Sequence, residues 1–89
     1  MRVAFAADHA GARFKTELLA RLAAAHPDHD LIDLGGDGSD PDDDYPDFAQ
    51  RLGHAIQSGD ADRGILICGS GVGASVAANK MTGVRAAIC

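Results

Sequence analysis

A thiol followed at once by a glycine-rich loop is the part of the sequence best suited to chemistry. Cys68 ends an apolar run and leads directly into the residues 69–73, GSGVG. Glycines let the backbone approach an anion closely, and a helix that begins here would add unpaired N–H groups and the positive end of its dipole. The loop can therefore hold a phosphate or a developing oxyanion. A packing turn beside an inert cysteine is the alternative interpretation.

A dinucleotide-binding loop is a competing interpretation of the same residues. Gly69, Gly71 and Ala74 satisfy the G-x-G-x-x-A spacing. That loop normally follows the first strand of its unit, with an acidic residue about 20 positions later, which falls at the extreme end of this sequence or beyond it. Gly73 is a further glycine that the fingerprint does not need. A nucleotide- or phosphate-binding α/β module is thus the weaker hypothesis.

A second candidate group is the pair Asp8-His9, which follows the apolar residues 2–7. Such a pair often serves only as a helix cap with a surface imidazole, and Asp8 could cap a helix that begins near Ala10. If the segments before His9 and Cys68 are strands of one sheet, however, the two groups converge on the same sheet edge. Convergence of this kind favours a shared site.

The remaining polar clusters are assigned no ligand. Six aspartates lie within residues 37–47, but this run lacks the alternating oxygen spacing and the final Glu of a calcium loop, so a solvated loop is expected. His26, His29 and His54 are expected at a helix end, in a loop and on a helix face, with no shared spacing to a second ligand. No metal site is predicted.

Four short segments are predicted to be the strands that must position these groups. They are residues 2–7, 30–34, 64–68 and, as the start of a fourth strand, 84–89. The third run is apolar on both faces, as a central parallel strand should be. Helical stretches separate the runs, which predicts a parallel sheet with helices on both faces and right-handed crossovers. Ligands of such sheets bind beyond the carboxyl ends of the strands.

Three helices are predicted between these strands. The first should carry one apolar stripe, formed by Phe14, Leu18, Leu22 and Ala25. The second should begin at Asp44 or Tyr45 with Pro46 in its first turn. Its inward residues should be Phe48, Leu52, Ala55 and Ile56. The third, rich in small residues, should follow the glycine loop and run through Lys80.

Composition excludes several classes of function. The 89 residues make at most one domain, and a net charge of −5 disfavours a broad basic face for nucleic acid or anionic membranes. The first residues are not predicted to form a signal peptide, and no apolar run approaches the roughly 20 residues of a membrane helix. Cys68 and Cys89 are expected to be free thiols. The expected compartment is the cytoplasm.

Several motifs, taken together and in order, resemble ribose-5-phosphate isomerase B and its galactose-6-phosphate and allose-6-phosphate isomerase relatives. They are AADHAG (6–11), DYPDFA (44–49), GILICGSGVG (64–73), AANK (77–80) and GVRA (83–86). The resemblance spans essentially the whole sequence. It implies a three-layer α/β/α sandwich with a parallel, Rossmann-like sheet, and a homodimer or dimer of dimers with its site at the subunit interface. It also implies an aldose–ketose isomerase that needs no cofactor.

The resemblance also implies roles for individual residues. Cys68 corresponds to the base that moves a proton between C1 and C2 of ribose 5-phosphate and ribulose 5-phosphate through an enediolate. Asp8 and His9 correspond to contacts with the sugar and the phosphate. One branch of the family has a Glu base at the position of Ala74, so Cys68 is the one candidate base here. Ser70 can add a hydroxyl to the anion hole, which corresponds to Gly69, Gly71, Val72 and Gly73.

Members of that family are longer than this sequence. Their remaining part carries a His-Asn pair that assists ring opening and arginines that clamp the phosphate. Residues 1–89 are therefore expected to be the N-terminal part of a single isomerase domain, and the fourth strand is expected to lack its neighbour in the sheet.

Overall fold

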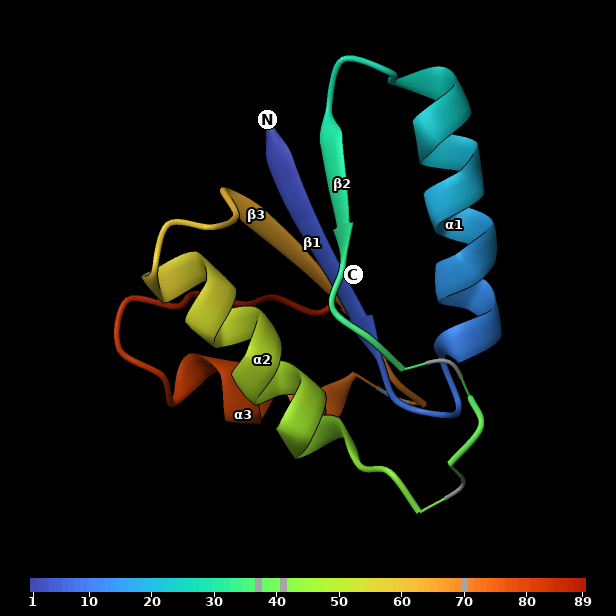
Figure 1. The fold of residues 1–89 in the computed structure, drawn as a ribbon. Coiled ribbons are helices and arrows are strands. Elements are labelled where there is room, and N and C mark those ends of the chain that lie inside the picture. The colour runs from blue at the N-terminus through green and yellow to red at the C-terminus, as the bar shows by residue number, and fades with distance from the viewer. Residues whose placement is uncertain (37, 41, 70) are drawn as a thin grey trace.

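The computed structural model describes residues 1–36, 38–40, 42–69 and 71–89, along which strands and helices alternate (Figure 1). The elements are β1 (Arg2–Ala7), α1 (Ala12–Ala25), β2 (Asp30–Asp33), α2 (Tyr45–Gln57), β3 (Arg63–Ile67) and α3 (Val72–Asn79). The strands form one parallel sheet in the order β2-β1-β3. The predicted α/β class is confirmed.

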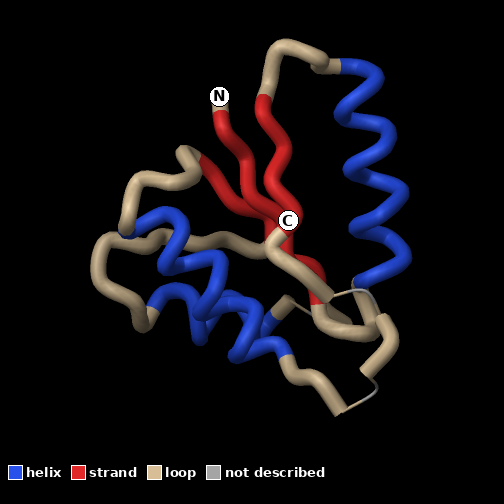
Figure 2. The backbone as a smooth tube through the Cα atoms, in the orientation of Figure 1, coloured by secondary structure: helices blue, strands red, loops and turns tan. Residues whose placement is uncertain are grey.

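Helices cover both faces of this sheet, so the molecule has three layers (Figure 1 and Figure 2). α1 packs on one face against β1 and β3, whereas α2 packs against the same strands on the other face, with α3 beside it. β1 is therefore enclosed on both faces, and its residues 4–7 are fully buried. The main core lies between β1 and α2 and consists of Ala4, Ala6, Phe48, Leu52, Ala55 and Ala61.

α2 begins and packs as its sequence predicts. The carboxylate of Asp44 caps the helix by accepting a hydrogen bond from the N–H of Tyr45 at 2.8 Å, and Pro46 occupies the first turn, where its missing N–H costs nothing. Phe48 and Leu52 are buried against the sheet. This helix therefore holds Tyr45 at a fixed position near the carboxyl ends of the strands.

The orientation of α1 differs from the prediction. Phe14 is 59% exposed, whereas Ala12 and Lys15 are the buried residues of this helix. The ammonium of Lys15 donates hydrogen bonds to Asp33 at 2.7 Å and to the carbonyl oxygen of Gly35 at 3.0 Å, both at the end of β2. Neighbouring helical side chains point about 100° apart, so turning Lys15 toward these partners turns Phe14 outward.

The ion pair of Lys15 and Asp33 keeps the aspartate charged. Partial burial alone would raise the pKa of Asp33, but the hydrogen bonds from Lys15 and from the N–H of Gly35 outweigh it and lower the pKa. A lowered pKa of the folded state contributes stability that is present above the ordinary pKa of aspartate. This contribution is lost as the pH falls through the lowered pKa.

The structure corrects two predictions about β3 and the residues 84–89. β3 was expected to be central, but among the described residues it lies at the sheet edge, and its side chains are exposed or half-buried. Residues 84–89, expected to begin a fourth strand, pair with no described strand. The side chain of Asn79 instead bonds the backbone of Ala86, donating to its oxygen at 3.0 Å and accepting from its N–H at 2.9 Å. In a segment without a partner strand, the backbone N–H and C=O groups must find other donors and acceptors.

Candidate functional site

The loops that follow β1 and β3 lie side by side at the carboxyl ends of the strands. Ala7 and Ile67 are register partners, and the N–H of Asp8 donates to the carbonyl oxygen of Ile67 at 3.3 Å. Asp8 and Cys68 thus follow directly on adjacent strands, whose axes in a parallel sheet are about 4.8 Å apart. The structure therefore brings the two predicted groups to one edge.

Gly11 allows this close approach. Its N–H donates to the Asp8 carboxylate at 3.1 Å and to the Asp8 carbonyl oxygen at 3.1 Å, which closes the turn after β1. A Cβ on Gly11 would lie 2.6 Å from Cγ2 and 2.7 Å from the carbonyl oxygen of Ile67. Only a residue without a side chain lets the first loop rest on the end of β3. Asp8 therefore caps this turn, and α1 begins at Ala12, two residues later than predicted.

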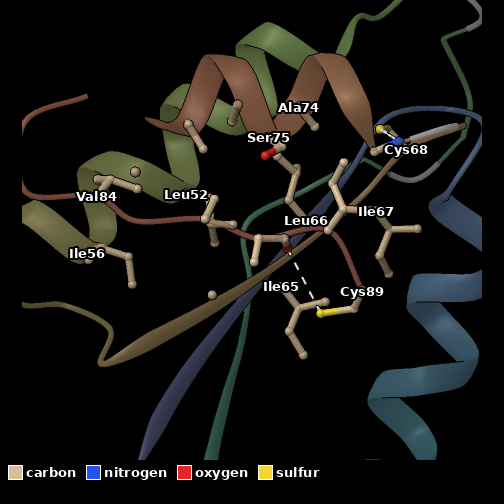
Figure 3. Close-up of a pocket in the computed structure, with 18 of the residues that line it drawn as sticks. Leu52, Ile56, Ile65, Leu66, Ile67, Cys68, Ala74, Ser75, Val84 and Cys89 are labelled. Carbon is tan, nitrogen blue, oxygen red and sulfur yellow. Dashed lines mark hydrogen bonds between the residues drawn. The ribbon is translucent and has the colours of Figure 1, made fainter. Parts of the chain in front are cut away.

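Cys68 begins the glycine-rich loop, with its sulfur near the N-terminus of α3. The N–H of Gly71 donates to Sγ at 3.0 Å, a bond drawn as a dashed line in Figure 3. Gly71 is the N-cap of α3 and has a φ of +81°, which glycine adopts without the strain that a Cβ brings. A backbone N–H aimed at sulfur beside a helix N-terminus is the environment in which cysteines act as bases or nucleophiles.

The other described loop residues differ in how much free space surrounds them. A Cβ on Gly69 would meet nothing within 4 Å, so the space over this residue is open. A Cβ on Gly73 would instead overlap the ring of Tyr45, which therefore closes the loop on the α2 side. Val72 begins α3 and is 58% exposed. Ser70, which was predicted to add a hydroxyl, lies outside the described residues.

Tyr45 was not singled out as a site residue by the sequence analysis. Its hydroxyl oxygen would lie 2.5 Å from a Cβ on Gly73, so the phenol rests directly on the glycine loop. The available signal was the DYPDFA motif, which was interpreted as a helix start and as one of the family motifs, without a role for Tyr45. The site thus includes a hydroxyl from α2 as well as the groups at the ends of β1 and β3.

His9 is held by Asp43, a member of the acidic run that was expected to be a solvated loop. One carboxylate oxygen of Asp43 accepts hydrogen bonds from the N–H of His9 at 2.7 Å and from its Nδ1 at 2.8 Å. The bond to the ring, together with the negative charge of Asp43, raises the pKa of His9 above its ordinary 6.5. Nδ1 is therefore the protonated nitrogen, and Nε2 remains available to a ligand.

The Asn variant of Asp43 should lower the pKa of His9, because it removes the charge and keeps the shape of the side chain. Since the folded-state pKa of His9 is raised, the stability that the pair contributes is fully present below the unfolded pKa. It is lost as the pH rises through the folded pKa. An NMR titration of the imidazole measures this pKa. Asp42→Asn is the control: it removes the same charge one residue earlier and should have little effect on the pKa of His9. If His9 titrated identically in the two variants, its pairing with Asp43 would be contradicted.

A groove of about 840 Å³ extends from Cys68 along β3 and α3 (Figure 3). Cys68, Gly69 and Gly71 line one end of it, whereas Asp8 and His9 do not line it. Much of its wall is apolar, formed by Leu52, Ile56, Ile65, Leu66, Ile67, Val84 and Ile88. An anionic sugar derivative needs hydrogen-bond donors and cations. Such a ligand is therefore expected over the two loops rather than along the groove.

Comparison with known proteins gives consistent matches. The profile of the ribose/galactose isomerase family matches residues 3–89. Ribose-5-phosphate isomerase B of Escherichia coli (strain K12) is 43% identical over 88 residues, which cover 99% of this chain and 57% of that protein. D-erythrulose-4-phosphate isomerase 2 of Mycolicibacterium smegmatis is 36% identical over 86 residues, covering 97% of this chain and 57% of that protein.

Solved structures show the same similarity. The structure of ribose-5-phosphate isomerase B from Clostridium thermocellum matches with a TM-score of 0.88 at 42% identity, covering 100% of this chain and 58% of that one. A type B ribose 5-phosphate isomerase from Trypanosoma cruzi matches with a TM-score of 0.90 at 37% identity, covering 100% and 59%. The chain thus spans 57–59% of the length of these four relatives.

Proposed function

The chain belongs to the ribose/galactose isomerase family, and on this basis we propose that it supplies the proton-transfer half of an aldose–ketose isomerase site. The substrate class is a phosphorylated sugar, with ribose 5-phosphate and ribulose 5-phosphate as the proposed pair. The observation that carries the proposal is the position of Cys68. Its sulfur accepts a hydrogen bond from Gly71 at the N-terminus of α3, directly beside the Asp8-His9 turn.

Cys68 is proposed as the base. A hydrogen on the carbon beside a carbonyl is weakly acidic, so its removal requires a base together with donors that stabilise the enediolate oxygen. The thiolate of Cys68 would take the C2 proton of the aldose and return it to C1, while the proton of the O2 hydroxyl passes to O1, which yields the ketose. The N–H groups of Gly69 and Gly73 would stabilise the charge that develops on oxygen, and the open space over Gly69 leaves room for the reacting carbons.

Asp8 and His9 are proposed to bind the sugar and its phosphate. The raised pKa of His9 keeps the imidazolium charged to a higher pH, and an imidazolium pairs favourably with a phosphate oxygen. Asp43 fixes the ring through Nδ1, so the donor that faces a ligand is Nε2. Asp8 is nearly buried and held in its turn by Gly11, which makes it a rigid acceptor for a sugar hydroxyl.

We further propose that residues 1–89 are the N-terminal part of one isomerase domain. The match covers 57–58% of these relatives, and the ring-opening groups and phosphate-clamping arginines are proposed to come from the remainder. A homodimer or tetramer is proposed, as the family resemblance implies. None of the described helices has the length and apolarity needed to span a bilayer. The metabolic enzymes among the relatives support the cytoplasm as the proposed compartment.

Conversion of ribose 5-phosphate, followed by NMR, tests the proposed function on the longest natural form of the protein. We expect turnover without an added cofactor. D-erythrulose 4-phosphate, named for one relative, is the second substrate to assay, and the ratio of the two kcat/KM values assigns the sugar. Binding of a nucleotide with no conversion of either sugar phosphate would favour the nucleotide- or phosphate-binding module and contradict the isomerase.

A further inference from the structure

We propose that the turn between α1 and β2 binds a divalent transition-metal ion through His26, Asp28 and His29. Each residue offers one ligand atom, and these three atoms all lie within 4.8 Å of one another. Two imidazole nitrogens and a carboxylate oxygen suit Zn²⁺, Ni²⁺ or Cu²⁺ better than Mg²⁺, which prefers an all-oxygen shell. The sequence analysis assigned these histidines no role because their spacing fits no motif, but the turn brings their side chains together.

The separation of the three ligand atoms can be closed by side-chain rotation. Bonds of about 2.0–2.1 Å in a tetrahedral site place ligand atoms roughly 3.4 Å apart. His26 and Asp28 are exposed, so their side chains can rotate from the observed separation to this shorter one without displacing packed neighbours. The two imidazole rings are 5.8 Å apart and tilted by 46°, so they are not stacked in a way that would hold them away from a shared ion.

The backbone of the turn is already held in place. The N–H of His26 donates to Leu22 at 2.8 Å, that of His29 to His26 at 3.2 Å, and that of Asp30 to Met1 at 3.0 Å. The ring of Pro27 also fixes the backbone φ angle of that residue. An ion would therefore order side chains only, which keeps the entropic cost of binding low.

Two local features favour a cation here. The turn follows the C-terminus of α1, the negative end of the helix dipole, and the last turn of this helix carries no basic residue. Nδ1 of His29 is buried and has no hydrogen-bond partner among the described residues. A buried nitrogen without a partner is a feature that a bound ion explains, because coordination supplies the missing interaction.

The proposed metal site is separate from the isomerase site. The turn precedes β2 and so lies at the amino ends of the strands, whereas Cys68 follows β3 at the carboxyl ends (Figure 1). An ion there would link the end of α1 to the start of β2 without touching the substrate. Its presence or absence is therefore independent of whether the proposed reaction is correct.

Titration of the protein with Ni²⁺, followed by ¹H–¹⁵N NMR and calorimetry, tests this proposal. The paramagnetic ion should broaden the amide signals of residues 25–30 first, and Mg²⁺ should leave them unchanged. His26→Ala and His29→Ala should each weaken Ni²⁺ binding by at least about 10-fold, which is the effect of losing even a supporting group of a metal site. His54→Ala, which removes a histidine from α2, is the matched control and should leave the affinity unchanged.

Two results would overturn the proposal. Broadening centred on Cys68 or Cys89 would show that a thiol is the binding group, since both cysteines are free. An affinity that is unchanged in His26→Ala would show that the turn is not the site. His26 is exposed, so this variant keeps the fold and remains informative even where His29→Ala is destabilised.

Discussion

Replacing Cys68 by Ser is expected to slow the removal of the C2 proton by at least about 100-fold and to leave substrate binding largely intact. A positioned general base typically accelerates proton transfer by about 10²–10⁴-fold. Serine keeps the size of the side chain and can still accept the hydrogen bond from Gly71, but its hydroxyl is far less acidic than a thiol and does not form the anion that the reaction needs. The contacts proposed for Asp8 and His9 are unaffected by the change.

The measurement is kcat together with the dissociation constant for ribose 5-phosphate. Cys89→Ser is the matched control, because Cys89 is also a free thiol but is exposed and is not part of the glycine loop. The control should retain wild-type turnover. If Cys68→Ser exchanged the C2 proton at the wild-type rate, Cys68 would not be the base.

A second large effect is expected from Gly11→Ala. The added methyl group would lie 2.6–2.9 Å from the side chain and backbone of Ile67, so the Asp8-His9 turn has to move away from the end of β3. Overpacking of this kind costs about 1–3 kcal/mol of stability. A displacement of about 1 Å between groups that act together can reduce the rate about 100-fold. Both kcat/KM and the melting temperature should therefore fall.

Gly69→Ala is the control for stability in this experiment. A methyl group on Gly69 meets nothing within 4 Å, so the melting temperature should stay close to that of the wild type. The crystal structure of Gly11→Ala should show the turn shifted from Ile67. If Gly11→Ala kept full activity and stability, the two loops would not depend on their direct contact.

Local sequence signals predicted the elements at the centre of the fold. The alternation of strands and helices indicated a parallel sheet, and Asp44 and Pro46 marked the start of α2 because caps and proline act within one turn of the chain. The convergence of Asp8 and Cys68 also followed from the sequence, since adjacent parallel strands place their carboxyl ends together.

Pairings between distant residues could not be predicted in this way. The contact of His9 with Asp43 spans 34 residues, and nothing in the acidic run distinguishes the one aspartate that faces the imidazole. The orientation of α1 depends on the ion pair of Lys15 with Asp33, which overrides the apolar stripe. The fourth strand, which was expected to lack its neighbour, does not form among the described residues, because strand formation depends on a partner strand as well as on apolar residues.

The most direct test of the proposed proton transfer is the isomerisation of ribose 5-phosphate in D₂O with the wild-type protein. Cys68 is only partly buried, so its proton should exchange with solvent during turnover. We expect the ribulose 5-phosphate formed to carry deuterium at C1, seen as the loss of a C1 proton signal in the NMR spectrum. Complete transfer of the C2 hydrogen to C1 without any deuterium would contradict proton transfer through a thiol at Cys68 that exchanges with solvent.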